Sequence, residues 1–241
     1  MHRGSGHDAA LRRADGRPDD TVRCPVSIPQ IVGYGTALPR AVRRCYGTQP
    51  IVPHARSSQR AIYDEIAASR PTGVHGPFGP WLASPGIAQP AQQLGRVCRL
   101  ETSLPRAESE LAILITAARH NATTEWAIHS SEARKAGVQA PPSSGPVPSR
   151  SALTGVLVPV TGVPDAVIAA IQQGERPRGL APRAAAVHDF ARSVLTCSNV
   201  DDVTYEEARL ALGEVALVEL TSIVGYYSLV AFTLNVFRIP P

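Results

Sequence analysis

The sequence contains little cysteine, and what it has is scattered. Four cysteines occur in 241 residues, at Cys24, Cys45, Cys98 and Cys197. No two stand close together, and none joins a histidine at the spacing of metal ligands. Small secreted scaffolds depend on dense disulfides, and structural zinc sites need closely spaced cysteine or histidine ligands. The sequence therefore argues against both classes, and we predict no metal site.

The chain also lacks an excess of charge where a fold is expected. The formal net charge of +4 belongs to residues 1–55, which hold eight arginines and four aspartates. Residues 56–241 hold sixteen basic and sixteen acidic residues, so their formal charge is zero. Without a basic excess, this part has no long-range attraction for polyanions. We therefore predict no nucleic-acid partner.

No apolar signal segment stands near the N-terminus, where arginines alternate with aspartates, and we expect a cytoplasmic protein. The stretch from Val215 to Phe237 is apolar and long enough to cross a membrane. No positive flank precedes it, and we favour a buried helix without a membrane partner. The polar residues that interrupt it are Glu219, Thr221, Ser222, Tyr226, Tyr227, Ser228 and Asn235.

Helical periodicity recurs after residue 56, whereas no convincing strand alternation appears. Residues 1–55 have no sustained period and many Gly, Pro and Arg residues, which predicts a disordered N-terminal extension. Residues 56–240 are predicted to form one all-α domain with short connections. Its expected helices span about 57–68, 85–100, 105–120, 123–136, 165–173, 182–196, 205–212 and 215–237.

Local signals predict how some of these helices begin. Ser84 is expected to cap the helix that Pro85 begins, and Pro90 is expected to kink or delay it. Pro105 is expected at the first position of the following helix. Residues 71–80 contain several glycines and prolines and are predicted to form a loop.

Residues 139–163 are rich in proline and serine at first and then apolar, and they show no period. Removing them would join Lys135-Ala-Gly-Val directly to Pro164-Asp-Ala-Val, which is a short connection between two helices. We interpret the segment as an irregular insertion. An ordinary surface loop is an equally open interpretation.

Two helical segments each carry one ionisable group in an apolar stripe. In the first, Glu110 borders a stripe of leucine, isoleucine and alanine. In the second, His129 lies between Trp126 and Ala133. A carboxylate and an imidazole on neighbouring helices can transfer protons. A core histidine and a solvated first-turn glutamate are the alternatives at these positions.

The combination of motifs on these segments resembles one known family. The motifs are Glu-Leu-Ala-Ile-Leu from Glu110, Glu-Trp-x-x-His from Glu125 to His129, and Ala-x-x-Ala-Gly from Ala133. Together they resemble the carboxymuconolactone decarboxylase family, which is related to alkyl hydroperoxidase D. Residues 218–240 are similar to the last helix of that family. The likeness covers roughly residues 56–240 and implies an alkyl hydroperoxidase D-like helical fold with a long central C-terminal helix.

The resemblance implies a lyase that removes a carboxylate from a small carboxylated lactone or a related metabolite. Such chemistry forms an enolate-like intermediate that is reprotonated, and it requires no metal or organic cofactor. His129 takes the position of the family's active-site histidine, with Glu110 and Glu125 as further catalytic candidates. Weaker candidates for the substrate pocket are Trp126, Arg119 and Tyr227.

The related hydroperoxidases carry a Cys-x-x-Cys pair before their histidine, and those two positions hold Ala122 and Glu125 here. A thiol peroxidase has no nucleophile at such a site, so peroxidase activity is disfavoured. A peroxiredoxin or alkyl hydroperoxidase-type antioxidant protein remains the alternative, as does a non-catalytic family member in which His129 is a core group. The resemblance further implies a homo-oligomer, a trimer or a hexamer, and the apolar surface of the final helix favours assembly.

Overall fold

The computed structural model describes residues 57–70, 73–136 and 162–240, and no strand occurs in these ranges. The predicted all-α fold class is confirmed. The predicted disordered extension over residues 1–55 lies outside the described residues. The described helices are α2 (Ser57–Ser69), α3 (Phe78–Leu82), α4 (Pro85–Leu100), α5 (Arg106–Arg119), α6 (Thr123–Lys135), α7 (Asp165–Gln172), α8 (Pro182–Cys197), α9 (Asp202–Leu212) and α10 (Glu214–Val236).

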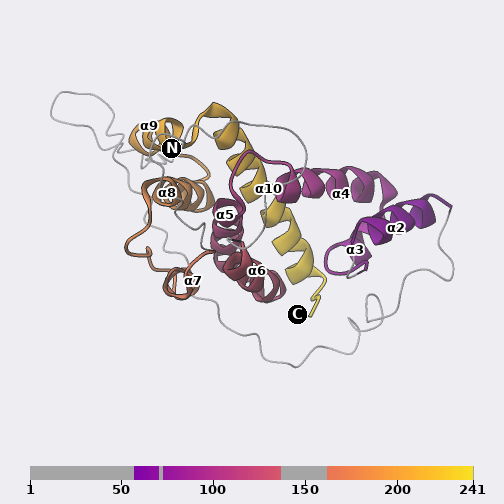
Figure 1. Cartoon of the computed structure of the whole chain (residues 1–241). Helices are drawn as coiled ribbons and strands as arrows, with labels where there is room; N and C mark the ends of the chain where they lie inside the picture. Colours follow the sequence, from indigo (N-terminus) through magenta and orange to yellow (C-terminus); the bar gives the residue numbers. More distant parts are fainter. Residues whose placement is uncertain (1–56, 71–72, 137–161, 241) are drawn as a thin grey trace, which may run out of the picture.

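Helix α5 lies at the centre of the fold (Figure 1). It packs against α6, α8 and α10 and also contacts α7. Every residue from Ser109 to Ala118 is buried, so α5 has almost no solvent-exposed face. A helix that is apolar on all sides and covered by neighbours is a core helix. Any ionisable side chain on it must therefore find a partner inside the protein.

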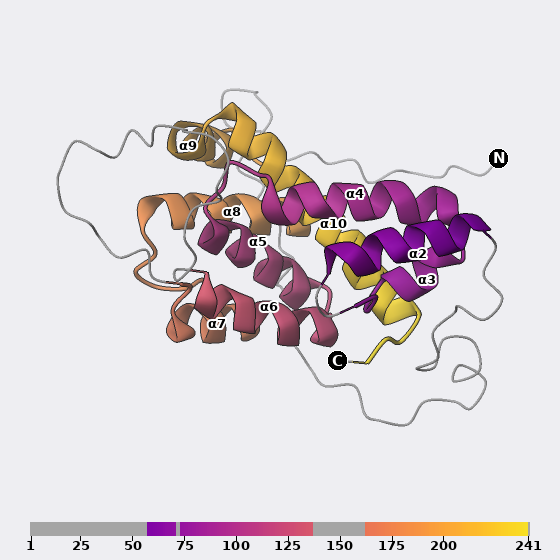
Figure 2. The same ribbon diagram turned by 45° about the vertical axis from the view of Figure 1, so that its right-hand side comes forward.

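Helix α10 connects the two halves of the molecule. In Figure 2 it runs from α9 and α8 on one side to α2, α3 and α4 on the other, and it contacts α4, α5, α8 and α9. Among the described helices it is the one long and apolar enough to cross a membrane, and half of its apolar window is buried in the fold. The sequence placed this helix at 215–237, and it spans Glu214–Val236.

Three predicted features near the N-terminal helices were wrong. Helix α4 begins at Pro85 and continues through Pro90, so the proline does not delay the helix. Pro90 has no N–H to donate to the Gly86 carbonyl. Gly86 and Pro90 are both exposed, so water can reach that carbonyl. Helix α5 begins at Arg106, one residue after Pro105. The loop expected over 71–80 gives way to α3 at Phe78, because burial of its aromatic side chains outweighs the glycine and proline signals.

The segment between α6 and α7 leaves and re-enters the fold at the same place. The backbone N–H of Val163 donates to the carbonyl of Ala133 over 2.9 Å. Gly162 lies so close to α6 that an added Cβ would stand 2.2 Å from the Arg134 carbonyl oxygen. Most of the segment predicted as an insertion, residues 139–161, lies outside the described residues. Its interpretation as an insertion stays a prediction, and the meeting of its two ends is compatible with it.

A cluster of aromatic rings joins α3, α4 and α10. The Tyr226 ring stacks edge-on against Trp81 and Tyr227, with centroids 6.2 Å and 5.3 Å away. Trp81 donates its indole N–H to Thr233 Oγ1 over 3.0 Å. The Tyr226 hydroxyl lies directly over Gly95 of α4, where an added Cβ would stand 2.1 Å from it. Gly95 therefore lets α10 place this tyrosine against α4.

We predict that Gly95→Ala destabilises the protein, whereas Gly86→Ala does not. Alanine in place of glycine ordinarily stabilises a helix by up to about 1 kcal/mol. An added Cβ at Gly86 meets nothing within 4 Å, so the gain should survive there. At Gly95 the methyl group must displace the Tyr226 ring, and such overpacking costs about 1–3 kcal/mol. Urea denaturation of both variants checks this, and equal effects at the two sites would contradict the packing described.

Candidate functional site

The two residues predicted to exchange protons lie in contact. Glu110 of α5 and His129 of α6 place Oε2 and Nδ1 2.7 Å apart. Glu110 is 0 % exposed and His129 is 8 % exposed. The alternative of a solvated first-turn glutamate is therefore wrong. Helices α5 and α6 are antiparallel neighbours joined by a short turn, which brings together residues nineteen positions apart.

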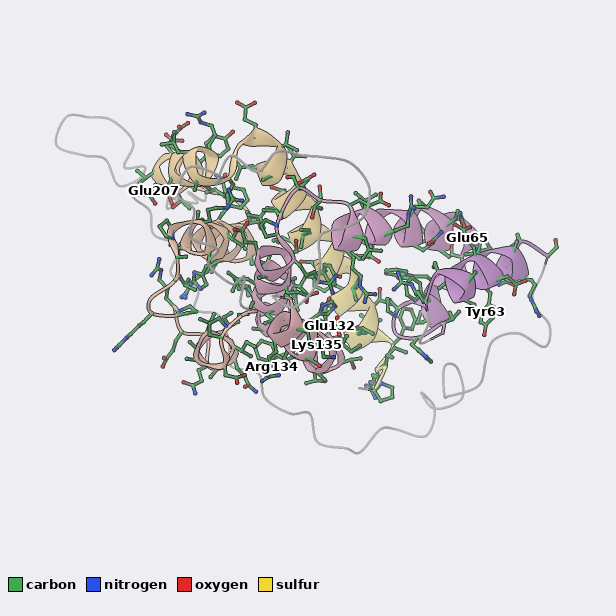
Figure 3. The ribbon with its side chains drawn as sticks, in the orientation of Figure 1. Tyr63, Glu65, Glu132, Arg134, Lys135 and Glu207 are labelled. Atoms are coloured by element: carbon green, nitrogen blue, oxygen red, sulfur yellow. The ribbon has the colours of Figure 1, made fainter. Side chains whose placement is uncertain are left out.

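Arg106 completes this buried array. Its Nη2 lies 2.7 Å from Glu110 Oε1, one helical turn away on α5, and 3.4 Å from Glu132 Oε2. Glu132 is labelled on α6 in Figure 3. The contact with Glu110 is an ion pair that lacks hydrogen-bond alignment, since Oε1 has no hydrogen-bond partner. The Glu110 carboxylate accepts from Nδ1 of the imidazole, which leaves Nε2 of His129 available for proton exchange.

Glu125 lies one helical turn before His129 and has a different environment. It is 2 % exposed, and neither of its carboxyl oxygens has a hydrogen-bond partner. Burial raises its pKa well above the ordinary value of 4.5. An ionised carboxylate without a partner is very costly in the interior, so burial favours the neutral, protonated form of Glu125. The site thus holds one paired carboxylate and one protonated carboxyl group, as acid–base enzymes do.

Tyr227 of α10 packs against the ring of His129. Its ring stands edge-on to the His129 ring, with centroids 5.0 Å apart. Burial raises the pKa of Tyr227 well above its ordinary value, and the neighbouring carboxyl groups of Glu110 and Glu125 raise it further. The phenol therefore keeps its proton. No hydrogen bond joins its hydroxyl to a side chain or backbone group in the described part of the chain.

The structure separates the other two predicted pocket residues from this array. Trp126 packs on a small cluster formed by Ala117, Ala122 and Ala231. Arg119 lies at the far end of α5, about 14 Å along the helix from Glu110 at 1.5 Å per residue. Its Nε donates to the Leu195 carbonyl over 3.1 Å, which ties α5 to α8. Neither side chain is brought to the Glu110–His129 contact.

Sequence reasoning missed Arg70 and Arg99, whose charges influence the pKa of Tyr226. Arg70 follows the last residue of α2, and Arg99 stands in the last turn of α4. Burial and the nearby charge of Arg99 lower the pKa of Arg70, and the tyrosines Tyr226 and Tyr227 partly offset this. These residues come from three separate helices, so no spacing in the sequence links them. An arginine near a helix C-terminus is also unremarkable by itself.

Thiol and metal chemistry find little support among the described residues. Cys98 is 1 % exposed, and burial raises its pKa to about 11. Such a thiol is protonated and unreactive at neutral pH. No cluster of three His, Cys, Asp or Glu side chains suited to a metal ion occurs in the described ranges.

No protein-family model and no curated protein matches the chain. The geometry of the site and the resemblance of its motifs therefore carry the functional argument.

We predict that Glu125→Gln removes a pH-dependent loss of stability. The folded protein keeps a proton on Glu125 that the unfolded chain releases above about pH 4.5. Wild-type stability should thus fall as the pH rises, by up to about 1.4 kcal/mol per pH unit until the carboxyl group ionises in the fold. Glutamine carries no such proton. In urea denaturation, the free energy of unfolding of the variant should exceed that of the wild type by an amount that grows between pH 5 and pH 8.

Glu207→Gln provides the matched control, because Glu207 is exposed on α9 (Figure 3). Its stability should follow that of the wild type at every pH. If the difference in unfolding free energy between Glu125→Gln and the wild type does not change with pH, as expected for the control, Glu125 is ionised in the folded protein. The description of the site then fails.

Proposed function

We propose that the chain is a cofactor-free lyase similar to carboxymuconolactone decarboxylase, acting on a small carboxylated lactone or a related acid. One observation carries this proposal. A carboxylate-oriented imidazole, Glu110–His129, lies beside a neutral carboxylic acid, Glu125, in a buried setting. The pair supplies a proton acceptor and a proton donor at neutral pH, which is what the removal of a carboxylate and reprotonation of carbon require.

The proposed reaction conserves electrons without a redox partner. The bond between the carbon and the carboxylate breaks, and carbon dioxide leaves. The electron pair stays on that carbon and is delocalised into the neighbouring carbonyl as an enolate. Glu125 then donates its proton to the carbon, and the enolate returns to a carbonyl. His129, which is 8 % exposed, relays a proton from solvent to restore Glu125. In this proposal the hydroxyl of Tyr227 donates a hydrogen bond to the enolate oxygen.

Two alternatives are weaker on the observations. An antioxidant of the alkyl hydroperoxidase type would need a reactive thiol, whereas its two positions hold Ala122 and Glu125, and Cys98 has a raised pKa. A non-catalytic protein would use His129 as a core group. That alternative does not explain why the buried carboxyl group of Glu125 has no hydrogen-bond partner.

We predict that His129→Ala abolishes turnover of a lactone acid, while a variant with all four cysteines replaced by serine keeps it. Loss of a group that transfers protons typically lowers kcat by a factor of about 100 to 10,000. Release of carbon dioxide from purified protein measures the effect. A folded cysteine-free protein without activity, together with full activity in His129→Ala, would instead require a thiol mechanism.

We also propose that the protein is a homo-oligomer assembled through an apolar seam on α10. The seam consists of Val215, Val218, Ser222, Gly225, Leu229, Phe232 and Val236. These residues are separated by steps of three and four, the spacing of a helix-pairing face. Ser222 and Gly225 lie at the middle of the seam, and an added Cβ at Gly225 meets nothing within 4 Å. Glycine in mid-helix lowers helix stability by about 1 kcal/mol. Close packing of a second copy of α10 against this position would account for the glycine. The large seam residues, 41 % to 70 % exposed, are Val215, Val218, Leu229, Phe232 and Val236.

Light scattering at micromolar concentration tests this assembly. The wild type should have the mass of a multiple of the chain, and the resemblance implies a trimer or a hexamer. Val218→Glu and Leu229→Glu should reduce the mass toward that of a monomer, because each buries a charge in the seam. Val203→Glu on α9, at a side chain 68 % exposed and outside the seam, should leave the mass unchanged. A strictly monomeric wild type would refute the proposal.

A further inference from the structure

Helix α9 leaves its apolar side chains exposed to water. Of its eleven residues only Ala208 is buried, whereas Val203, Tyr205 and Leu210 are 68 %, 43 % and 77 % exposed. A surface helix of a soluble protein ordinarily turns its apolar stripe toward the core. Apolar side chains that gather on the water-facing side of a helix instead mark an interaction surface.

These side chains border a groove between α8 and α9. The two helices pack side by side (Figure 1), and the groove has a volume of about 500 Å³. Its small and apolar lining residues are Pro182, Ala185, Ala186, Leu210 and Ala211. Glu207 also lines it, and Val203 shares this face of α9 because residues four apart are neighbours on a helix. The groove therefore has room for apolar side chains beside an exposed carboxylate.

The surface around the groove is locally acidic. Residues 201–214 contain five acidic residues and one basic residue, so their formal net charge is −4. The one basic residue, Arg209, pairs with Glu206. Three exposed carboxylates form no ion pair within the described ranges, namely Asp202, Glu207 and Glu214. The charge complement of this surface is a basic segment that also carries apolar side chains.

The chain itself contains a stretch of that composition. Residues 21–56 hold five arginines and no acidic residue, so their formal charge is +5. In Leu38-Pro-Arg-Ala-Val-Arg-Arg-Cys-Tyr46 three of these arginines stand among apolar residues. The stretch ends where α2 begins, at Ser57. Its 36 residues, at up to about 3.3 Å each, span far more than the diameter of about 40 Å expected for a domain of this size.

We propose that residues 21–56 bind in the groove between α8 and α9, with their arginines on the unpaired carboxylates and their apolar side chains against the alanines. A guanidinium group donates two parallel hydrogen bonds to a carboxylate, which makes arginine the suited cation here. Apolar side chains leave water when they enter the groove. No residue of the Glu110–His129 site lines the groove, so this proposal is independent of the proposed lyase activity.

Limited proteolysis of the full chain by trypsin, followed by mass spectrometry, tests this binding. Trypsin cleaves after arginine, and the cleavage rate follows the fraction of molecules in which the segment is free. Leu210→Arg removes an apolar side chain from the groove and adds a like charge. At low ionic strength we expect it to raise the cleavage rate within residues 21–56 about tenfold. Leu100→Arg on α4 is the matched control, because Leu100 is 62 % exposed and lies outside the groove.

Salt and dilution provide two measurements that need no variant. Raising the ionic strength from about 0.01 M to about 1 M shortens the screening length from about 30 Å to about 3 Å. Cleavage of the wild type should then approach the rate seen in Leu210→Arg. Dilution at a constant trypsin concentration should leave the protection unchanged, because the segment and the groove belong to one chain. Thermal melting of Leu210→Arg should give a Tm close to that of the wild type, since the replaced side chain is exposed.

Three results would overturn the proposal. The first is equal cleavage of the wild type and Leu210→Arg at low ionic strength, with no effect of salt. The second is an equal acceleration by Leu100→Arg, which would show that any added surface charge releases the segment. The third is loss of protection on dilution, which would assign the groove to the segment of a second copy.

Discussion

Burial of the Glu110 carboxylate is the constraint on which the site depends. A carboxylate with no exposed surface, on a helix that is covered on every side, requires charged partners from nearby elements. Arg106 supplies a cation from the same helix, and His129 adds a hydrogen bond from α6. The pairing fixes how α5 and α6 are rotated relative to one another, and it also orients the imidazole. Removing Arg106 would leave the buried carboxylate without a cation, and breaking a buried ion pair in this way costs about 3–5 kcal/mol.

The polar groups around this array are unusual because several have no partner. Native interiors pair nearly all buried polar atoms. Here Glu125, Arg70 and Arg99 keep buried atoms without hydrogen bonds. Each unpaired group lowers the stability of the empty protein. Proteins that keep such groups commonly trade stability for function.

The sequence predicted the parts of this structure that depend on local pattern. Helical periodicity placed most of the helices, and the positions of Glu110 and His129 in their stripes indicated a meeting on neighbouring helices. The alternation of glycine and proline before Trp81 predicted a loop and missed α3, because packing of aromatic rings decides that segment. Arg70 and Arg99 could not be linked to the site from sequence, since their neighbourhood arises only when α2, α4 and α10 pack together.

Deuterium incorporation tests the central claim most directly. The purified chain would be incubated with a carboxylated lactone in deuterium oxide, and the product would be followed by nuclear magnetic resonance. We expect one carboxylate to leave as carbon dioxide and one deuteron to appear on the carbon that carried it, because Glu125 and His129 exchange their protons with solvent. A folded protein that releases no carbon dioxide and incorporates no deuterium would contradict the assignment of this site to proton transfer.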